Sequence, residues 1–161
     1  METDKKKQKA RNNAYCLLRS RPRSERELRE RLRLKGYGDD IVEDVVSGLK
    51  NSGDIDDAKF AKLWVESRVN FNPMGEIVLR QELKVKGVSD AIIDATMEEC
   101  LKGYDEYAVA FNMAAEQFRR FAKLDRRKAM KRLYDFLARR GFKFDIIEKV
   151  IGKITQEHED R

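Results

Sequence analysis

Few residues in the 161-residue sequence have the types and spacing that catalysis or metal binding requires. The only histidine, His158, lies in the charged C-terminal stretch, where we expect a frayed helix end rather than a ligand or a base. No glycine-rich loop ends in Lys-Ser or Lys-Thr, and no histidine or cysteine pair has zinc spacing. Carboxylates are numerous, but on charged helical faces they favour solvated ion pairs. We therefore expect no enzyme, no cofactor and no metal site.

Basic side chains are the chemical feature that stands out. The chain has 35 Lys and Arg against 29 Asp and Glu, a net charge of +6. The excess is concentrated in residues 1–35 and 105–161, above all in 119–143, whereas 36–58 is acidic. Separated cationic surfaces suit a polyanion such as nucleic acid. Solubility alone also places Lys and Arg on helices, and the charge pattern does not decide between the two.

Two groups of basic residues are candidates for contacts with phosphate. Arg127 and Lys131 are spaced i, i+4, and so are Lys128 and Arg132, which gives one helix a cationic face. We expect phosphate contacts from Arg19, Arg21, Arg23, Arg126, Arg127, Lys128, Lys131, Arg132 and Arg140. Arg140 also has a competing local role, because a cation stabilises the negative end of a helix.

The composition argues against several classes of protein. No window approaches the ~20 apolar residues that a membrane-spanning helix needs, and the polar, basic N-terminus does not resemble a secretory signal. Cys16 and Cys100 are too few for a disulfide scaffold. We expect both cysteines to be buried and reduced, as is typical of a cytoplasmic protein.

The elements that position the basic residues are predicted to be helices almost throughout. Apolar residues recur at i, i+4 and i+7 rather than alternating, and the sequence has only two prolines. Short polar side chains mark the helix starts, because they accept hydrogen bonds from the first amides. The expected caps are Ser24 with Glu27 as a capping box, Asp56 or Asp57, Asn72 before Pro73, and Ser89.

A unit of about 50 residues is repeated three times. Gly36, Gly87 and Gly141 each follow a basic residue, with leucines eight and four positions earlier and an isoleucine five positions later. The leucines share one face of a helix. The glycine then ends that helix in a left-handed turn that would cost another residue about 1–2 kcal/mol. With the amphipathic segment upstream, each unit is predicted to contain three helices.

The predicted fold is therefore all-α, with three tandem three-helix repeats that stack into an elongated, curved array. The expected order is a disordered basic tail (1–9), repeats at 10–52, 53–102 and 103–155, and a charged tail (156–161).

The middle repeat carries a specific motif. It runs from Asp56-Asp57-Ala58-Lys59-Phe60-Ala61 through Ser67-Arg68 and Gly75 to Arg80-Gln81-Glu82-Leu83 and Lys86-Gly87-Val88-Ser89. This motif resembles the RecX family, bacterial regulators of the recombinase RecA. The outer repeats are similar to that family's first and third repeats, so the resemblance covers about residues 10–155.

The resemblance implies a regulator without chemistry of its own. It would bind in the groove of the RecA filament on single-stranded DNA and block filament growth, strand exchange and ATP hydrolysis. The implied partners are RecA, as a filament and as free protein, single-stranded DNA and, more weakly, duplex DNA. No membrane is involved, and we expect a cytoplasmic monomer.

The residues that we expect to contact the protein partner are Arg68, Arg80, Lys86, Tyr37 and Phe71. Phe142 also lies beside a turn and is expected to be accessible to a partner. Many family members have a basic loop where this chain has the uncharged stretch 69–75, which moves the expected phosphate contacts to the first and third repeats.

Two other functions are compatible with parts of the sequence. A helix–turn–helix protein that acts directly on duplex DNA fits the helix-Gly-helix pattern. No repeat, however, has a helix rich in Arg, Asn and Gln for reading base edges, and 88–101 is acidic. A nuclease with scattered acidic ligands is the remaining alternative.

Overall fold

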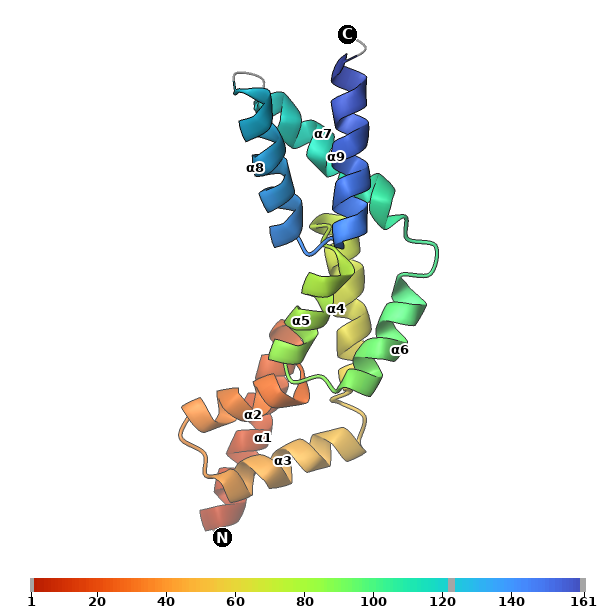
Figure 1. The fold of residues 1–161 in the computed structure, drawn as a ribbon. Coiled ribbons are helices and arrows are strands. Elements are labelled where there is room, and N and C mark those ends of the chain that lie inside the picture. The colour runs from red at the N-terminus through yellow and green to blue at the C-terminus, as the bar shows by residue number, and fades with distance from the viewer. Residues whose placement is uncertain (1, 122–123, 160–161) are drawn as a thin grey trace. The chain divides into compact units, whose positions relative to one another are not determined.

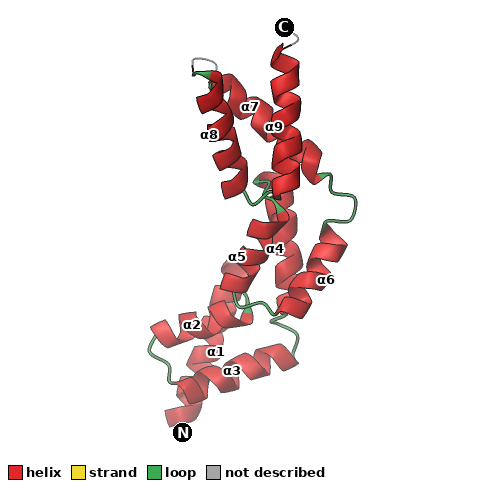
Figure 2. Cartoon of the chain, in the orientation of Figure 1, coloured by secondary structure: helices red, strands yellow, loops and turns green. Residues whose placement is uncertain are grey.

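The structure is a computed structural model that describes residues 2–121 and 124–159. Every regular element in these ranges is a helix (Figure 2), which confirms the predicted all-α class. The helices, labelled in Figure 1, are α1 (Glu2–Ser20), α2 (Glu25–Leu34), α3 (Asp39–Asn51), α4 (Asp57–Phe71), α5 (Glu76–Val85), α6 (Asp90–Cys100), α7 (Glu106–Arg120), α8 (Arg126–Arg139) and α9 (Phe144–Glu159).

The chain forms two compact units, and the division between them passes through α4 and α5. The first unit contains Met1–Glu66 and Glu82–Glu99, and the second contains Ser67–Gln81 and Cys100–Arg161. The middle group of three helices is therefore shared between the units. The elongated, curved arrangement of the repeats stays a prediction.

The core of the first repeat lies between α1, α2 and α3. The repeated leucines Leu28 and Leu32 are fully buried on one face of α2. They belong to the same apolar cluster as Val42, Val46 and Leu49 of α3. Burying a leucine side chain contributes about 1.5–3 kcal/mol, so this leucine pair is a main source of the repeat's stability.

The third repeat has an equivalent core between α7, α8 and α9. Leu133 and Leu137 of α8 are fully buried and share a cluster with Ile147 and Val150 of α9. Phe142 is in this cluster and only 2% exposed, so our expectation that it faces a partner is wrong. The glycine turn before Phe142 directs the chain back over α8 and carries the ring into the core.

The predicted left-handed turns are confirmed at all three repeat glycines. The φ angles are +84° at Gly36, +81° at Gly87 and +82° at Gly141. Glycine is suited to these positions because a Cβ atom makes this backbone conformation unfavourable.

The helix starts agree with the predictions in two of the three places that the structure tests. Ser24 and Glu27 form the capping box, and Asp56 accepts hydrogen bonds from two amides in the first turn of α4. Asn72 does not cap α5, which begins four residues later. Its side-chain oxygen accepts a hydrogen bond from Arg140 instead, at 2.7 Å.

The N-terminal segment is more ordered than expected. The prediction of a disordered tail over 1–9 is wrong for residues 2–9, which form the first half of α1. The lysines and the glutamine in this segment are good helix formers. Lys7 also contacts Asp44 of α3, with 3.2 Å between Nζ and Oδ2.

The C-terminal helix also extends further than expected. α9 continues to Glu159, so the predicted tail 156–161 begins inside a helix. The backbone of His158 is helical, and its side chain lies outside the described residues.

The prediction that both cysteines are buried is wrong. Cys100 is half-buried but Cys16 is exposed, because α1 buries Ala10 and Ala14, and Cys16 lies on another face of that helix.

Within residues 2–121 and 124–159, no helix is both long and apolar enough to cross a membrane.

Candidate nucleic-acid and partner interface

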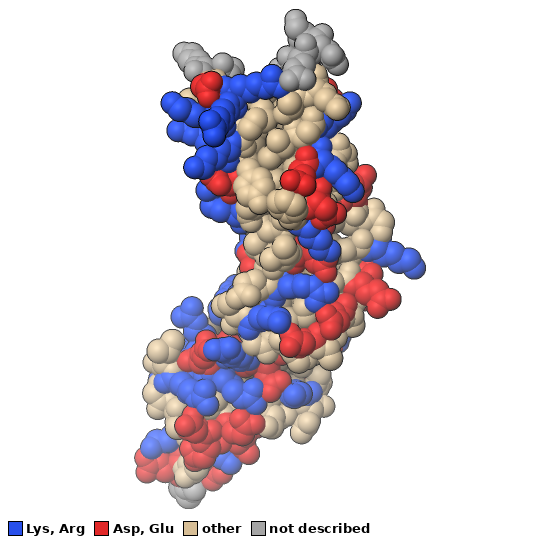
Figure 3. All heavy atoms as spheres, in the orientation of Figure 1, with Lys and Arg blue, Asp and Glu red and all other residues tan. Residues whose placement is uncertain are grey.

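Helix α8 carries the most concentrated positive charge among the described helices. Its one acidic residue is Asp135, and its basic residues are Arg126, Arg127, Lys128, Lys131, Arg132 and Arg139, all of them exposed. In Figure 3 the Lys and Arg atoms gather over α8, at the upper left. The structure therefore brings five of the nine predicted phosphate contacts onto one helix.

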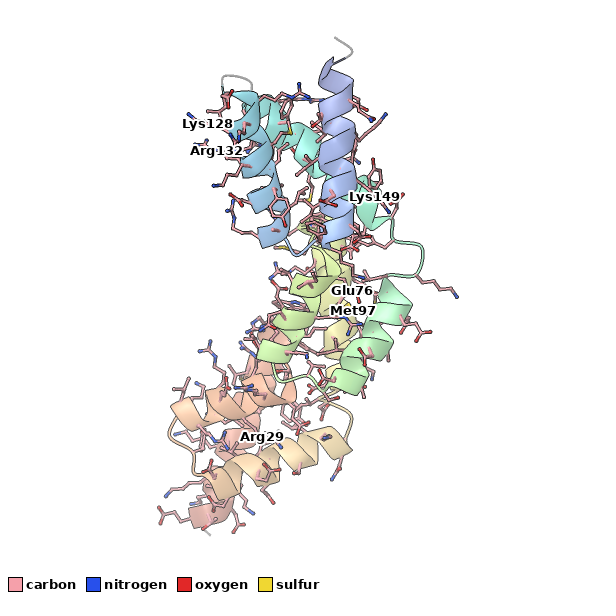
Figure 4. The ribbon with its side chains drawn as sticks, viewed as in Figure 1. Arg29, Glu76, Met97, Lys128, Arg132 and Lys149 are labelled. Carbon is pink, nitrogen blue, oxygen red and sulfur yellow. The ribbon has the colours of Figure 1, made fainter. Side chains whose placement is uncertain are left out.

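Three of these charges are not neutralised within the part of the chain that the structure describes. There, Arg127, Lys128 and Lys131 form no ion pair. Arg132 lies over the ring of Phe121, 5.8 Å from its centroid, which restricts the guanidinium without reducing its charge. Lys128 and Arg132 extend from α8 away from α9 (Figure 4). The face is thus available to an anionic ligand.

The basic residues in the first turn of α8 destabilise that helix. Every other helix in the described ranges has an acidic residue in its first turn, whereas α8 has none. Each cation at a helix N-terminus opposes the helix dipole by about 0.3–1 kcal/mol, and like charges at i, i+4 repel by about 0.2–0.5 kcal/mol. Asp125 offsets part of this cost as the N-cap. A cluster that destabilises its own helix is better explained by a ligand than by folding.

Several basic residues of the first repeat have a different environment, because acidic neighbours neutralise them. Arg29 contacts Glu25 at 2.5 Å and Glu43 at 3.1 Å. Arg21, a predicted phosphate contact, donates two hydrogen bonds to Glu27, each of 3.2 Å. The excess of basic residues in 1–35 therefore does not produce a free cationic face on α2.

Arg23 and Arg19, in the same region, differ in their exposure and their hydrogen bonds. The Nε of Arg23 donates to the carbonyl of Leu17 at 3.1 Å, and desolvation lowers the pKa of its guanidinium. Arg19 is exposed and has no ion pair within residues 2–121 and 124–159. Contact of Arg19, Arg21 and Arg23 with phosphate stays a prediction, and two of the three have structural roles that the sequence did not reveal.

Lys86 connects the first two repeats within the first unit. Its carbonyl accepts a hydrogen bond from Ser24 Oγ at 2.6 Å, and its ammonium lies 2.8 Å from Glu27 Oε1. The ammonium also lies 4.1 Å from the centre of a Trp64 ring, a cation–π contact. We call this contact between residues 86–87 and the start of α2 the first joint.

Arg140 has the equivalent role in the second unit. Its carbonyl accepts a hydrogen bond from the amide of Gly75 at 2.8 Å, and its guanidinium donates to Asn72. The carbonyl of Gly141 accepts from the amide of Ile77 at 3.3 Å. We call this contact between residues 140–141 and residues 72–78 the second joint. Lys86 and Arg140 therefore connect repeats, and contact with a partner or DNA stays a prediction for both.

A half-buried carboxylate completes each joint. Asp57 Oδ1 accepts from the amide of Glu25 at 2.8 Å, and Glu106 Oε1 accepts from the amide of Glu76 at 3.0 Å. Burial raises the pKa of both accepting carboxyl groups. From the sequence, Asp57 was expected only as a helix cap, and Glu106 was not predicted. The residues whose amides donate to them, Glu25 and Glu76, are 51 positions apart, the spacing of the first two repeat glycines, and this spacing could have identified the two equivalent contacts.

The other predicted partner contacts have separate surroundings. Arg68 and Arg80 are half-buried, and Arg80 pairs with Glu76 at 2.8 Å. The hydroxyl of Tyr37 accepts a hydrogen bond from α1, and its ring packs against the first core. Phe71, at the end of α4, is 85% exposed and remains the most accessible of the group.

The ion pairs of the first joint predict a specific acid sensitivity. Burial raises the pKa of Glu27, but hydrogen bonds from Arg21 and Lys86 outweigh this effect and lower the pKa to about 2. A folded-state pKa below the unfolded value contributes stability that is complete above about pH 4.5 and is lost as the pH falls toward 2. We expect Glu27→Gln to reduce the free energy of unfolding by up to about 3 kcal/mol at pH 7 and to flatten its dependence on pH below 4.5.

Urea unfolding between pH 3 and pH 7 measures this effect. Glu30→Gln is the matched control, because Glu30 is 53% exposed in its pair with Arg26 and such surface pairs contribute about 0–1 kcal/mol. An unchanged pH dependence in Glu27→Gln would contradict the assigned ion pairs.

The described residues contain no group of three or more His, Cys, Asp or Glu side chains that could hold a metal ion. The surfaces that these residues offer for binding are the cationic face of α8 and the exposed ring of Phe71.

Comparison with known proteins identifies the family. Three family models match in order along the chain: the first RecX three-helix domain at residues 10–49, the second at 56–97 and the third at 104–151. The chain belongs to the RecX family. A regulatory protein RecX from Chlorobium phaeobacteroides (strain BS1) is 36% identical over 153 residues, which cover 95% of this chain and 97% of that protein. The RecX of Streptomyces coelicolor is 34% identical, over 89% of this chain and 77% of that protein.

Solved structures of RecX proteins share this fold. The crystal structure of RecX from Lactobacillus salivarius matches with a TM-score of 0.79 at 21% identity and covers 93% of this chain and 97% of that one. A second RecX crystal structure matches with a TM-score of 0.80 at 23% identity, over 89% of this chain and 70% of that one. The predicted three-helix repeats are thereby confirmed.

Proposed function

We propose that this RecX-family chain is a non-enzymatic cytoplasmic regulator that binds the RecA filament on single-stranded DNA. Binding inhibits filament growth, ATP hydrolysis and strand exchange, and so modulates recombination and DNA repair. Its relatives are named regulatory proteins RecX, which supports a regulatory role.

The observation that carries the DNA-binding part is the cationic face of α8. A RecA filament displays protein and phosphate together, and a regulator that covers both needs unneutralised cations for the phosphate. Lys128, Lys131 and Arg132 provide them on one helix. Phosphate neutralisation releases counterions, so this contact predicts an affinity that falls as salt rises.

A steady-state ATPase assay tests the proposal. RecA, ATP and single-stranded DNA are combined with increasing amounts of the purified chain, and phosphate release is followed. We expect turnover to fall at substoichiometric amounts of the chain, because one bound molecule would stop growth of a filament of many RecA subunits. Unchanged turnover at a molar excess would refute the assignment.

A parallel measurement without RecA tests the nuclease alternative. The chain alone is incubated with magnesium and labelled single-stranded DNA, and the DNA length is followed on a gel. We expect intact DNA, and cleavage by the pure chain would replace the regulatory proposal by a nuclease.

A further inference from the structure

The turn at residues 35–36 is a third copy of the structure that forms both joints, and in the described chain nothing is docked on it. A Cβ atom built on Gly87 would lie 2.4 Å from Arg26, and one built on Gly141 would lie 2.5 Å from Val78. At Gly36, which has nearly the same φ, no atom lies within 4 Å of that position. The first repeat therefore has the docking turn without a docked helix.

The backbone of this turn shows the same difference. In the joints, the carbonyls of Lys86 and Arg140 each accept a hydrogen bond from the start of the docked helix. Within residues 2–121 and 124–159, the carbonyl of Lys35 accepts none. Carbonyls at a helix C-terminus carry partial negative charge, and the amides that begin another helix are suitable donors for them.

A pocket of about 490 Å³ lies beside Gly36. Its walls include Tyr37 and Ile41, and three lysines, Lys6, Lys9 and Lys35, surround it. Lys6 pairs with Glu2 at 3.3 Å, whereas Lys9 and Lys35 have no ion pair in the part of the chain that the structure describes. The pocket thus combines two uncompensated cations with a small apolar wall.

The two joints show which ligand such a turn accepts. In each one the docked segment is a helix start with a small residue, Ser24 or Gly75, directly before its first helical residue. Each docked helix also has a glutamate in its first turn that pairs with a lysine of the docking side: Glu27 with Lys86, and Glu76 with Lys143. The lysines around Gly36 are suited to the same acidic helix start.

We propose that the pocket beside Gly36 binds the N-terminus of a helix of another protein, with a small capping residue and a glutamate in its first turn. In a second copy of this chain, the two helix starts that combine a small cap with a first-turn glutamate, those of α2 and α5, are already held in the joints. This site goes beyond the proposed function, because it lies in the first unit and does not use α8 or DNA.

Chemical-shift mapping on the full-length chain tests the site. The probe is a synthetic peptide with the sequence of residues 72–85, the helix start held in the second joint. We expect selective, saturable shifts of the amides of residues 35–38. The double variant Lys9→Glu/Lys35→Glu, and separately a peptide with Glu76→Lys, should each weaken binding at least tenfold. Absence of shifts at residues 35–38, or equal shifts in the double variant, would overturn the proposal.

Two controls keep the result specific. The variant Lys102→Glu/Lys149→Glu makes the same change in net charge outside the pocket and should retain peptide binding. Loss of binding in this variant would show that the effect of Lys9→Glu/Lys35→Glu comes from net charge alone, and not from the pocket. A 12-nucleotide oligo-dT is the second probe. If it shifts residues 35–38 and competes with the peptide, the pocket is a phosphate site and the helix proposal is wrong. The outcome is independent of any effect on RecA.

Discussion

Gly141→Ala is expected to destabilise the protein far more than Gly36→Ala, although both glycines have the same backbone conformation. Each substitution costs about 1–2 kcal/mol for a left-handed residue with a side chain. At Gly141 the new methyl group would also lie 2.6 Å from the amide nitrogen of Val78, in the second joint. Overpacking of this kind costs typically about 1–3 kcal/mol more. At Gly36 the methyl group meets no atom within 4 Å.

Chemical unfolding followed by circular dichroism measures both variants. Gly103→Ala is a second control, because Gly103 has φ +78°, open surroundings and a place in the same unit as Gly141. We expect the two open positions to lose similar amounts of stability and Gly141→Ala to lose more than either. Equal losses in all three variants would show that the second joint contributes nothing to stability.

Reversing the charge on α8 is expected to weaken binding to single-stranded DNA strongly. The variant replaces Arg127, Lys128, Lys131 and Arg132 by glutamate. If each of these cations neutralises one phosphate, the slope of log affinity against log salt should fall by about 2–3, and the affinity at low salt should fall about 100-fold or more. Fluorescence anisotropy with oligo-dT at several salt concentrations measures both quantities. Inhibition of RecA turnover should weaken in parallel.

Stability provides an internal check on this variant. Cations at the start of α8 oppose its dipole, so acidic replacements should leave the melting temperature unchanged or raise it. Loss of binding without loss of stability then reports on the interface. A matched variant with Lys59, Lys84, Lys102 and Lys149 replaced by glutamate has the same net charge and should keep most of the affinity. Equal losses in both variants would remove α8 from the proposed interface.

Much of the local structure could be predicted because it depends on short-range physical chemistry. Leucines four positions apart must lie on one helix face, and Leu28 and Leu32 are buried together as expected. Left-handed turns require glycine, which identified all three turns. Asn72 shows where this reasoning fails. Its type and its place before proline favour a cap, but a guanidinium distant in sequence competes for its oxygen.

The sequence by itself therefore determined the helices, the repeat, its turns and the family resemblance, since all of these depend on periodicity, residue type and motif. Only the tertiary structure decided which cations are free. Arg21 and Arg127 are equivalent as residues in basic stretches, yet Glu27 neutralises the first and no acidic side chain pairs with the second among the described residues. Likewise Gly36 and Gly141 share one motif, and only the packing of α5 distinguishes an occupied turn from an open one. Ion pairing and docking depend on residues brought together by folding, which a local pattern does not contain.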